Sequence, residues 1–281
     1  MRLATIRIAD GTRAVRVEAD RYVDVGLPDV GTLLRHPDWA GYAAAACGRA
    51  HDPAGADLAP PVTQPGKILC VGLNYRTHIL EMGRDLPAYP TLFAKYAEAL
   101  IGPADPILLP PESGAVDWEG ELAVVVGRTV RRASADEAAR AIAGFMVLND
   151  VTMRDWQYRT PQWLQGKTFE GSTPAGPVLV TPDELSGGTA PELMLTTSVD
   201  GEIVQKASTD DLVFKPAALV QYASLILTLR PGDIIATGTP GGVGHARKPA
   251  RYLTHAARLV TEITGIGRLD NVALSEAGGP R

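Results

Sequence analysis

Three carboxylates stand at the ends of two apolar segments of the sequence. Glu119 and Glu121 begin the apolar run of residues 119–127, and Asp150 ends the run GFMVLND. Side chains two positions apart on a strand point to the same face, so the two glutamates are expected to lie together. Ionised carboxylates beside a buried strand repel each other and are costly to desolvate, and a divalent cation between them removes that cost. The pattern is interpreted as a metal site, with the solvated face of an edge strand as the alternative.

The chemistry of these side chains predicts the class of ion. Carboxylate oxygens without histidine or cysteine favour a hard cation, Mg²⁺ or Mn²⁺ (or Ca²⁺), over zinc. An octahedral ion held by three protein ligands keeps about three positions for water and substrate. The predicted site therefore has room for a substrate that binds the cation through oxygen atoms.

A second group that can do chemistry is the pair His78 and Glu81 in the segment NYRTHILE. Their spacing of three residues places both side chains on one face of a helical turn. A carboxylate beside an imidazole fixes its tautomer and raises its basicity, which suits a general base that activates water. The alternative is a surface helix that carries an incidental ion pair.

Three further polar side chains follow the third carboxylate along the chain. Arg154 and Gln157 are three residues apart, so both can face a cavity and offer a bidentate donor and an amide to an anionic substrate. Lys167, which follows a glycine, can stabilise an oxyanion near the cation or deliver a proton. The alternatives are a structural ion pair of Arg154, for example with Asp155, and a surface location for Lys167.

Residues 237–244, TGTPGGVG, form a glycine-rich segment after a predicted strand. Its backbone amides and hydroxyl groups can hold a carboxylate, as backbone nests do. It is not a P-loop, because no Gly-Lys-Ser/Thr sequence closes it. A simple turn is the alternative interpretation of this segment.

Strands are expected to position most of these side chains. Apolar, β-branched runs predict buried strands, and Asp-Gly turns at 10–11 and 200–201 predict hairpins. The predicted strands are 3–8, 14–17, 67–72, 119–127, 145–148, 193–199, 202–206, 233–236, 259–263 and 268–272. The predicted helices are 32–35, 39–47, 77–82, 134–143 and 216–227. Thr77 and Ser134 are expected to cap two of these helices, the second in a capping box with Glu137.

The chain is predicted to fold as a small N-terminal domain, residues 1–60, and a larger domain, residues 61–281. The proline- and glycine-rich segment 51–66 has no periodicity and is predicted to be a linker outside any helix or strand ladder. In the larger part strands outnumber helices and do not strictly alternate with them. An α+β, mostly β fold is therefore expected rather than a doubly wound parallel one.

The composition disfavours several classes of protein. Lys and Arg number 27 against 32 for Asp and Glu, and the resulting net charge of −5 argues against a nucleic-acid partner. Two cysteines cannot build a disulfide framework, and they fit a reducing compartment. No apolar run is long enough to cross a bilayer, and the first residues lack the hydrophobic region of a signal peptide. We therefore expect a cytoplasmic protein without a membrane or nucleic-acid partner.

Six motifs occur in order along the second part of the chain. They are VGLNYRTHILEMG, GAVDWEGELAVVVG, GFMVLNDVTMRDWQ, LQGKTFEGSTPAGP, VDGEIVQKAST and LRPGDIIATGTPGGVG. Together they resemble the fumarylacetoacetate hydrolase family over about residues 65–273, and the first part resembles the small variable domain that often precedes this family's core. The resemblance implies a mixed β-roll of packed sheets with few helices, a homodimer, and bound Mg²⁺ or Mn²⁺ (sometimes Ca²⁺).

The resemblance also implies roles for particular side chains. The implied metal ligands are Glu119, Glu121 and Asp150. The implied catalytic residues are His78, Glu81 and Lys167. The implied substrate-binding residues are Arg154, Gln157 and Thr239.

By the same resemblance, the activity is hydrolysis of a carbon–carbon bond in a 1,3-dioxo acid such as an acylpyruvate or fumarylpyruvate, as in aromatic catabolism. Water activated by the His78–Glu81 dyad would attack the distal carbonyl group, and the cation and Lys167 would hold the departing enolate. Alternatives on the same site are decarboxylation of a β-keto acid such as oxaloacetate and isomerisation of a hydroxymuconate-like acid. A non-catalytic ligand-binding protein is disfavoured, because it need not keep all of these residues.

Several other residues bear on the choice of substrate. Tyr89, Phe93 and Trp163 are candidates for the pocket wall, with core packing as the alternative. His245 follows the glycine-rich segment at a position that varies in the family, and Glu170 stands where the family more often has aspartate. Neither departure removes an implied metal ligand or the dyad.

Overall fold

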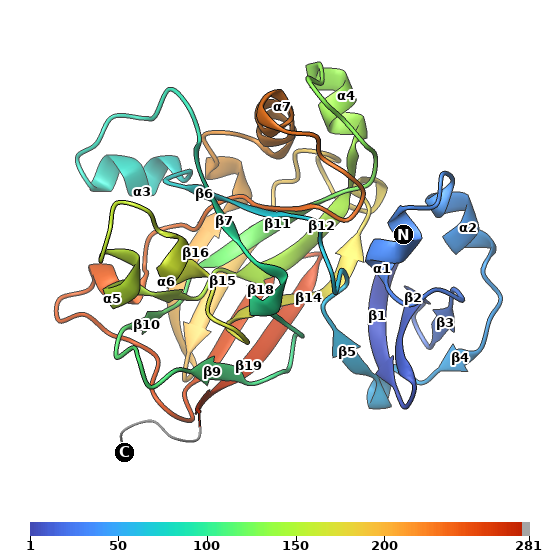
Figure 1. The fold of residues 1–281 in the computed structure, drawn as a ribbon, viewed down its shortest axis with the longest axis horizontal. Coiled ribbons are helices and arrows are strands. Elements are labelled where there is room, and N and C mark those ends of the chain that lie inside the picture. The colour runs from blue at the N-terminus through green and yellow to red at the C-terminus, as the bar shows by residue number, and fades with distance from the viewer. Residues whose placement is uncertain (277–281) are drawn as a thin grey trace.

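The fold is built mainly of β-strands, as the β-branched runs of the sequence predict. The computed structural model describes residues 1–276, and Figure 1 shows a large twisted sheet with a second sheet packed against it. Strands predominate and the sheets mix parallel with antiparallel pairs, which confirms the predicted α+β, mostly β class.

The larger sheet carries twelve strands, and the smaller one carries five. The path through the larger sheet is β4 (Ala50–His51), β3 (Tyr22–Asp24), β2 (Gly11–Val17), β1 (Arg2–Ile8), β14 (Thr173–Val180), β12 (Ile142–Asn149), β11 (Gly120–Val126), β17 (Ile234–Ala236), β6 (Ile68–Gly72) and β7 (Thr91–Lys95). Beside this path β5 (Asp57–Ala59) pairs with β1, and β8 (Leu100–Ile101) pairs with β14. The smaller sheet is β16 (Glu202–Ser208), β15 (Met194–Val199), β18 (Arg258–Ile263), β19 (Gly267–Ser275) and β9 (Ile107–Leu109). A two-stranded ladder joins β10 (Val116–Asp117) to β13 (Thr152–Met153).

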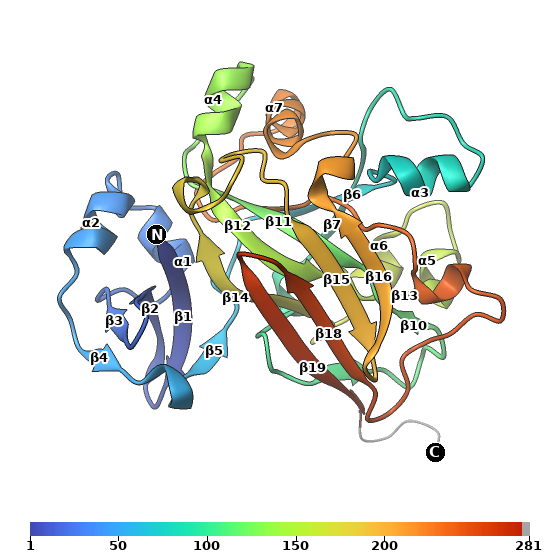
Figure 2. The same ribbon diagram turned by 180° about the vertical axis from the view of Figure 1, so that it is seen from behind.

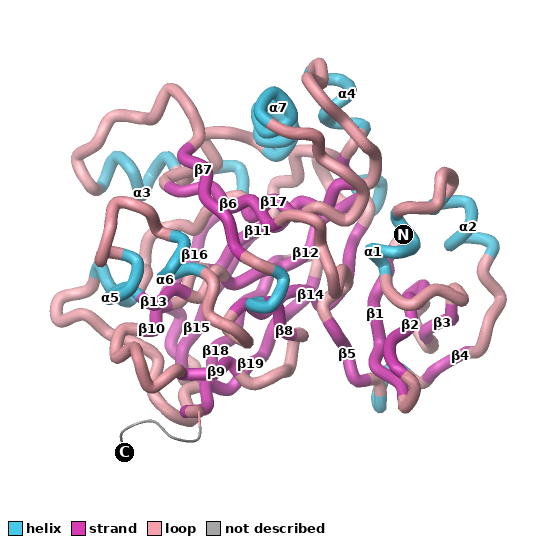
Figure 3. Tube along the Cα trace, viewed as in Figure 1, coloured by secondary structure: helices cyan, strands magenta, loops and turns pink. Residues whose placement is uncertain are grey.

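Helices are short and lie around the sheets, as the cyan segments of Figure 3 show. The α-helices are α1 (Val30–Leu34), α2 (Trp39–Ala45), α3 (Arg76–Glu81), α4 (Ala135–Arg140), α5 (Arg154–Gln157), α6 (Leu164–Lys167) and α7 (Pro216–Ile226). Single 3₁₀ turns are η1 (Pro53–Gly55), η2 (Ala97–Ala99), η3 (Pro182–Glu184), η4 (Thr209–Asp211) and η5 (Gly244–Ala246). Among the described residues, no helix has both the length and the apolar character needed to span a bilayer.

The core lies where the two sheets face each other. Every residue of β11 and of β12 is buried, and the two strands pair in antiparallel register with Val124 opposite Phe145. A strand buried on both faces has apolar residues at nearly every position. This is why GELAVVV and IAGFMVLN do not alternate between apolar and polar residues. Figure 2 shows β15, β16, β18 and β19 of the smaller sheet side by side in front of this pair.

The N-terminal strands extend the larger sheet instead of forming a sheet of their own. They lie to one side of the molecule, blue in Figure 1, and β1 meets β14 at Arg2↔Val180 and Leu3↔Leu179. The domain division near residue 60 stays a prediction. The expectation that residues 51–66 lie outside any ladder is wrong, because β5 pairs with β1 and His51 pairs with Tyr22. Its prolines and glycines flank the short strand Asp57–Ala59, so they do not interrupt that ladder.

The cap predicted from the sequence is confirmed at one helix and wrong at another. Ser134 and Glu137 form the expected capping box at the start of α4. Thr77 does not cap α3, which begins one residue earlier; instead Asp211 accepts hydrogen bonds from the Thr77 backbone and hydroxyl, each at 3.0 Å. A side chain distant in sequence therefore satisfies an amide of the first turn.

The sequence analysis missed β14, which pairs with β12 in the centre of the larger sheet, and β7, which pairs with β6 at its edge. Pro174 and Pro177 interrupt the strand pattern of β14, because proline cannot donate to a ladder. The ladder with β12 shifts register between Phe145 and Val147, which accommodates this irregular strand. The strand β7, TLFAK, follows a loop and is too short to show alternation.

Candidate active site

The three predicted metal ligands converge at one end of the central strand pair. Glu119 immediately precedes β11, Glu121 lies in it, and Asp150 immediately follows β12. Because Gly120 pairs with Asn149 in the antiparallel ladder, the beginning of one strand lies beside the end of the other. The three carboxylates are buried and offer oxygen atoms within 4.8 Å of one another. The structure therefore brings together the side chains that the sequence analysis grouped.

Backbone contacts fix these carboxylates in place. The Asp150 amide donates to the Glu119 carbonyl at 2.8 Å, and the Glu119 amide donates to the Asn149 side chain at 2.9 Å. The Gly238 amide donates to Glu121 Oε2 at 2.7 Å. Gly238 has φ +101°, a conformation that other residues rarely adopt, so glycine allows this close approach. The glycine-rich segment does hold carboxylates, but they belong to the protein: Glu121 through the Gly238 amide and Asp117 through the Gly244 amide.

Two buried ammonium groups lie against these three carboxylates, Glu119, Glu121 and Asp150, which we call the acidic cluster. Lys167 Nζ lies 2.6 Å from Glu119 Oε2 and 2.7 Å from Asp150 Oδ2, and Lys95 Nζ lies 2.7 Å from Asp150 Oδ1. Burial by itself would raise the pKa of Asp150, but the two lysines outweigh it and hold that pKa at about 2. Burial would lower the pKa of Lys167, yet Asp150 and Glu119 outweigh it and raise that pKa. Asp150 and Lys167 therefore stay charged near neutral pH.

Glu121 is the member of the cluster with the least compensation. Burial, followed by repulsion from Asp150 and Glu119, raises the pKa of Glu121 well above its usual value. A hard divalent cation among the three carboxylates would relieve this repulsion, and all-oxygen ligands suit such an ion. The chemistry of the cluster thus fits Mg²⁺ or Mn²⁺.

Arg154 and Gln157 lie together on α5, as their spacing predicts. Arg154 Nη1 donates to Gln157 Oε1 at 2.9 Å, and its other nitrogens reach Asp117 Oδ2 at 2.8 Å and Glu119 Oε1 at 2.6 Å. The alternative of an ion pair of Arg154 is confirmed, but its partners are Asp117 and Glu119 and not Asp155. Burial would lower the pKa of Arg154, but Glu119 and Asp117 outweigh it and raise that pKa.

Asp117 is a residue of the site that the sequence analysis missed. Its fully buried carboxylate accepts hydrogen bonds from the backbone of Gly244 and His245, at 2.7 and 2.9 Å, as well as from Arg154. Its only signal in the sequence is its place two residues before Glu119 in the motif DWEGE. Lys95 carried no signal, because a lysine at the end of a short strand is usually exposed.

Thr239 lies at the edge of the cavity and is held by the backbone of β11. Its hydroxyl donates to the Gly120 carbonyl at 3.0 Å and accepts from Gln205 Nε2 at 2.8 Å. Gln205 also accepts from the Gly120 amide at 3.0 Å, so the hairpin motif VDGEIVQKAST supports the start of β11. Gln205 is a second residue whose role the sequence analysis did not identify.

His78 and Glu81 both lie on α3, on the side of the molecule that carries α5 and α6 and faces away from the N-terminal strands (Figures 1 and 3). A side chain built at Gly241 would meet both, with its Cβ 3.1 Å from His78 Nδ1 and 3.7 Å from Glu81 Oε2. Within residues 1–276 the two side chains interact through charge without a direct hydrogen bond. Burial lowers the pKa of His78, against the opposing effect of Glu81 and Glu119.

Several of these groups line one cavity of about 320 Å³. Its polar lining includes His78, Glu119, Glu121, Arg154, Gln157 and Lys167. Phe93 and Trp163 form an apolar wall, with ring centroids 5.4 Å apart. Tyr89 does not belong to this wall, because its side chain is 72% exposed and lies against Tyr222. A small apolar cavity with a few convergent charged groups is typical of an enzyme active site.

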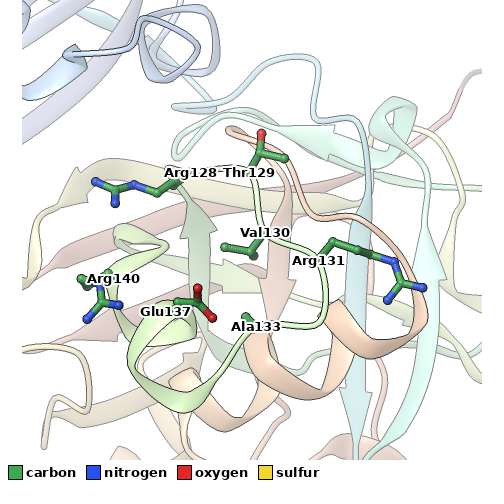
Figure 4. Close-up of a pocket in the computed structure, with 7 residues that line it drawn as sticks. All are labelled: Arg128, Thr129, Val130, Arg131, Ala133, Glu137 and Arg140. Carbon is green, nitrogen blue, oxygen red and sulfur yellow. The ribbon is translucent and has the colours of Figure 1, made fainter.

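A second hollow, of about 330 Å³, lies along the segment between β11 and α4. Figure 4 shows the side chains of Arg128 and Arg131 extending to opposite sides of it. Glu137 in the same hollow already accepts hydrogen bonds from Ser134 in the capping box. The polar groups of this hollow do not converge on one point. The cavity lined by His78, Glu119 and Glu121 is therefore the better candidate for an active site.

Comparison with known proteins gives a family and several relatives. Residues 67–273 match the family described as "Fumarylacetoacetate (FAA) hydrolase C-terminal". The chain is 45% identical over 212 residues to the mitochondrial oxaloacetate tautomerase Fahd2a of Rattus norvegicus, which covers 75% of this chain and 67% of the relative.

Two solved structures share the fold over nearly the whole chain. The fumarylacetoacetate hydrolase of Exiguobacterium antarcticum has a TM-score of 0.88 at 31% identity, covering 98% of this chain and 100% of that one. The 5-carboxymethyl-2-hydroxymuconate delta-isomerase of Mycobacterium smegmatis has a TM-score of 0.83 at 32% identity, with the same coverage of 98% and 100%. The relatives therefore carry names of three different activities on one fold.

Proposed function

The chain belongs to the fumarylacetoacetate hydrolase family, and from that premise we propose that it is a metal-dependent enzyme that interconverts the enol and keto forms of a 2-oxo acid of the oxaloacetate type. One observation carries the proposal: Glu119 and Glu121 of the acidic cluster line the same cavity as His78, and Asp150 lies within 4.8 Å of both glutamates. The 45% identity to an oxaloacetate tautomerase supports this reaction over the others known by name among the relatives.

Glu119, Glu121 and Asp150 would hold the cation, Mg²⁺ or Mn²⁺, which when bound polarises a carbonyl oxygen as a Lewis acid. Lys167 stays protonated because its pKa is raised, so it is suited to stabilise negative charge on an enolate oxygen and not to deliver a proton. Arg154 and Gln157 are placed to orient the carboxylate of the substrate, since both line the cavity.

His78 is the proposed acid–base residue. In the keto-to-enol direction its imidazole removes a proton from the carbon next to the ketone, and the resulting imidazolium then gives that proton to the enolate oxygen. No atom enters or leaves overall, and no water is consumed. The lowered pKa of His78 keeps the imidazole unprotonated near neutral pH, as a base requires.

Hydrolysis of a 1,3-dioxo acid of the acylpyruvate type is the second candidate function. It is favoured by the position of Glu81 beside His78 near Gly241, where a water-activating dyad would be expected, and by the similarity to a fumarylacetoacetate hydrolase. Here His78 would take a proton from water, whose oxygen adds to the distal carbonyl carbon before the carbon–carbon bond breaks. Decarboxylation needs no attacking water and would leave CO₂ as its signature.

One assay separates these candidates. Oxaloacetate enol and a set of acylpyruvates are mixed with the protein in Mg²⁺ or Mn²⁺, with and without chelator, and enol absorbance, pyruvate and CO₂ are followed. We expect metal-dependent loss of enol absorbance without pyruvate or CO₂. Pyruvate from an acylpyruvate would establish the hydrolase instead, CO₂ from oxaloacetate would establish the decarboxylase, and no turnover in any mixture would contradict the enzymatic proposal.

The proposal includes a homodimer and a cytoplasmic location, as expected from the family resemblance and from the composition. The name of the rat relative places that protein in mitochondria, so the compartment is a separate question for this chain. Light scattering on the purified chain and localisation of a tagged copy in its own cells test the two statements.

A further inference from the structure

We propose that His245 determines substrate specificity by receiving the second carboxylate of a dicarboxylic oxo acid. The inference rests on the proposed function, because it assumes that the first carboxylate and the ketone lie at the acidic cluster. His245 has no part in the proposed proton transfer, and the sequence places it at the end of the glycine-rich segment.

The backbone of His245 is fixed relative to the catalytic groups. Its amide donates at 2.9 Å to Asp117 Oδ2, the same oxygen that accepts from Arg154 Nε at 2.8 Å. Arg154 in turn pairs with Glu119. Asp117 therefore links the His245 backbone to Arg154, and His245 and Arg154 line the same cavity.

Two tyrosines orient the imidazole ring. Nδ1 lies 2.9 Å from the Tyr252 hydroxyl, and the ring centroid lies 5.3 Å from that of Tyr158 at an interplanar angle of 33°. When the Tyr252 hydroxyl donates to Nδ1, the ring proton stays on Nε2, a donor for which residues 1–276 offer no hydrogen-bond partner. The stacked Tyr158 ring limits the ring's freedom to turn away.

The charges around this end of the cavity favour an anion. His245 and Arg84 both line the cavity, and among residues 1–276 no carboxylate oxygen lies within 4 Å of a ring nitrogen of His245 or a guanidinium nitrogen of Arg84. The nearby Asp117 carboxylate is already paired with Arg154 and with the backbone amides of Gly244 and His245. The two acids in the lining, Glu119 and Glu121, are occupied by Lys167, Arg154 and the Gly238 amide. Both donors, His245 and Arg84, are exposed to solvent. A second carboxylate would accept from them, whereas an apolar acyl group that displaces water from them would not replace its hydrogen bonds.

The test compares ligands that differ only in the second charge. Oxaloacetate and 2-oxoglutarate, each beside the methyl ester of its terminal carboxylate, are titrated by calorimetry into the Mn²⁺-loaded protein. For at least one pair we expect the wild-type chain to bind the acid about tenfold or more tightly than the ester, since a hydrogen bond to a charged group has that effect. In His245→Gln this preference should fall to about twofold, and Tyr252→Phe should reduce it in part.

His255→Gln is the matched control, because His255 is exposed and accepts a hydrogen bond from the Ser275 amide instead of facing the cavity. It should keep the full preference for the acid. The inference is overturned if wild type does not prefer either acid, if His245→Gln keeps the preference, or if His245→Gln weakens acid and ester equally, which would indicate a structural role.

Failure of the proposed function gives a different result. If wild type prefers the acid but does not interconvert enol and keto forms, the subsite stands and the reaction assigned to the cavity is wrong. If wild type catalyses that reaction but the preference does not depend on His245, the reaction stands and the subsite is wrong.

Discussion

His78 is the side chain whose removal separates acid–base chemistry from binding. In His78→Ala we expect kcat for enol–keto interconversion to fall about 10²–10⁴-fold, as is usual when a general base is removed. Mn²⁺ affinity by calorimetry should change little, because His78 is not one of the acidic ligands. His36→Ala, at an exposed histidine near α1, is the control and should behave as wild type. Near-normal turnover by His78→Ala would contradict the assignment.

The pH profile tests the protonation state of the same residue. Burial lowers the pKa of His78 despite the charges of Glu81 and Glu119, and a base works only when unprotonated. Raising the pH through this pKa should therefore increase kcat/KM, and the acid limb should lie below the ordinary value of 6.5. The measurement is kcat/KM against pH at saturating metal; an acid limb above 6.5 would show that the dyad charge outweighs burial.

Lys95 tests whether the buried charge pairs stabilise the protein. Lys95→Met leaves Asp150 without one of its two ammonium partners, and we expect the free energy of unfolding without metal to fall by about 3 kcal/mol, as for other broken buried pairs. Urea unfolding measures the change. Lys215→Met removes a half-exposed pair with Asp210 and should cost less than about 1 kcal/mol. Equal effects of the two substitutions would argue against an energetic role for burial.

At the scale of elements, α3 depends on a contact that lies far away in the sequence. Asp211 accepts from the Thr77 amide and hydroxyl, so Asp211→Ala should destabilise the first turn of α3 by about 1 kcal/mol, as loss of an N-cap does. Because α3 carries His78, amide exchange in α3 should become faster and turnover slower. Asp210→Ala, one residue away and paired with Lys215, should change neither. Unchanged exchange in α3 of the Asp211 variant would contradict this view.

The elements also show what the sequence alone could predict. The apolar runs of β11 and β12 are evident in the sequence. They also predict the strand ends at which Glu119, Glu121 and Asp150 lie. Their neighbour β14 was hidden by Pro174 and Pro177, whose backbone conflicts with a regular strand pattern. The order of strands in the sheet could not be predicted, because pairing is decided by tertiary packing and not by local pattern.

Some side chains of the site were predictable from their own spacing, and others, such as Lys167 and Thr239, from the family resemblance. Arg154 and Gln157 lie together because both belong to one short helix, α5. Asp117 and Lys95 acquire their roles from partners on other elements, Arg154 and Asp150. Such partnerships depend on long-range packing, so residue type and local spacing do not reveal them.

At the scale of the whole molecule, the site joins segments that are far apart in the chain. β17 pairs in parallel with β6 and antiparallel with β11, which brings the glycine-rich segment after β17 to the acidic cluster. A cation bound there would hold β11 and β12 together through their side chains. Metal binding and global stability should therefore be linked.

This linkage can be measured on the intact chain. Mg²⁺ or Mn²⁺ at about 100 times its Kd should raise the free energy of unfolding by about 2.7 kcal/mol, because an ion that binds only the folded state stabilises it by mass action. Glu121→Gln removes a ligand and the buried repulsion together, so it should lose most of this gain while remaining folded without metal. Glu262→Gln, at an exposed position of β18, should keep the full gain. A gain of the same size in Glu121→Gln would place the cation away from the acidic cluster.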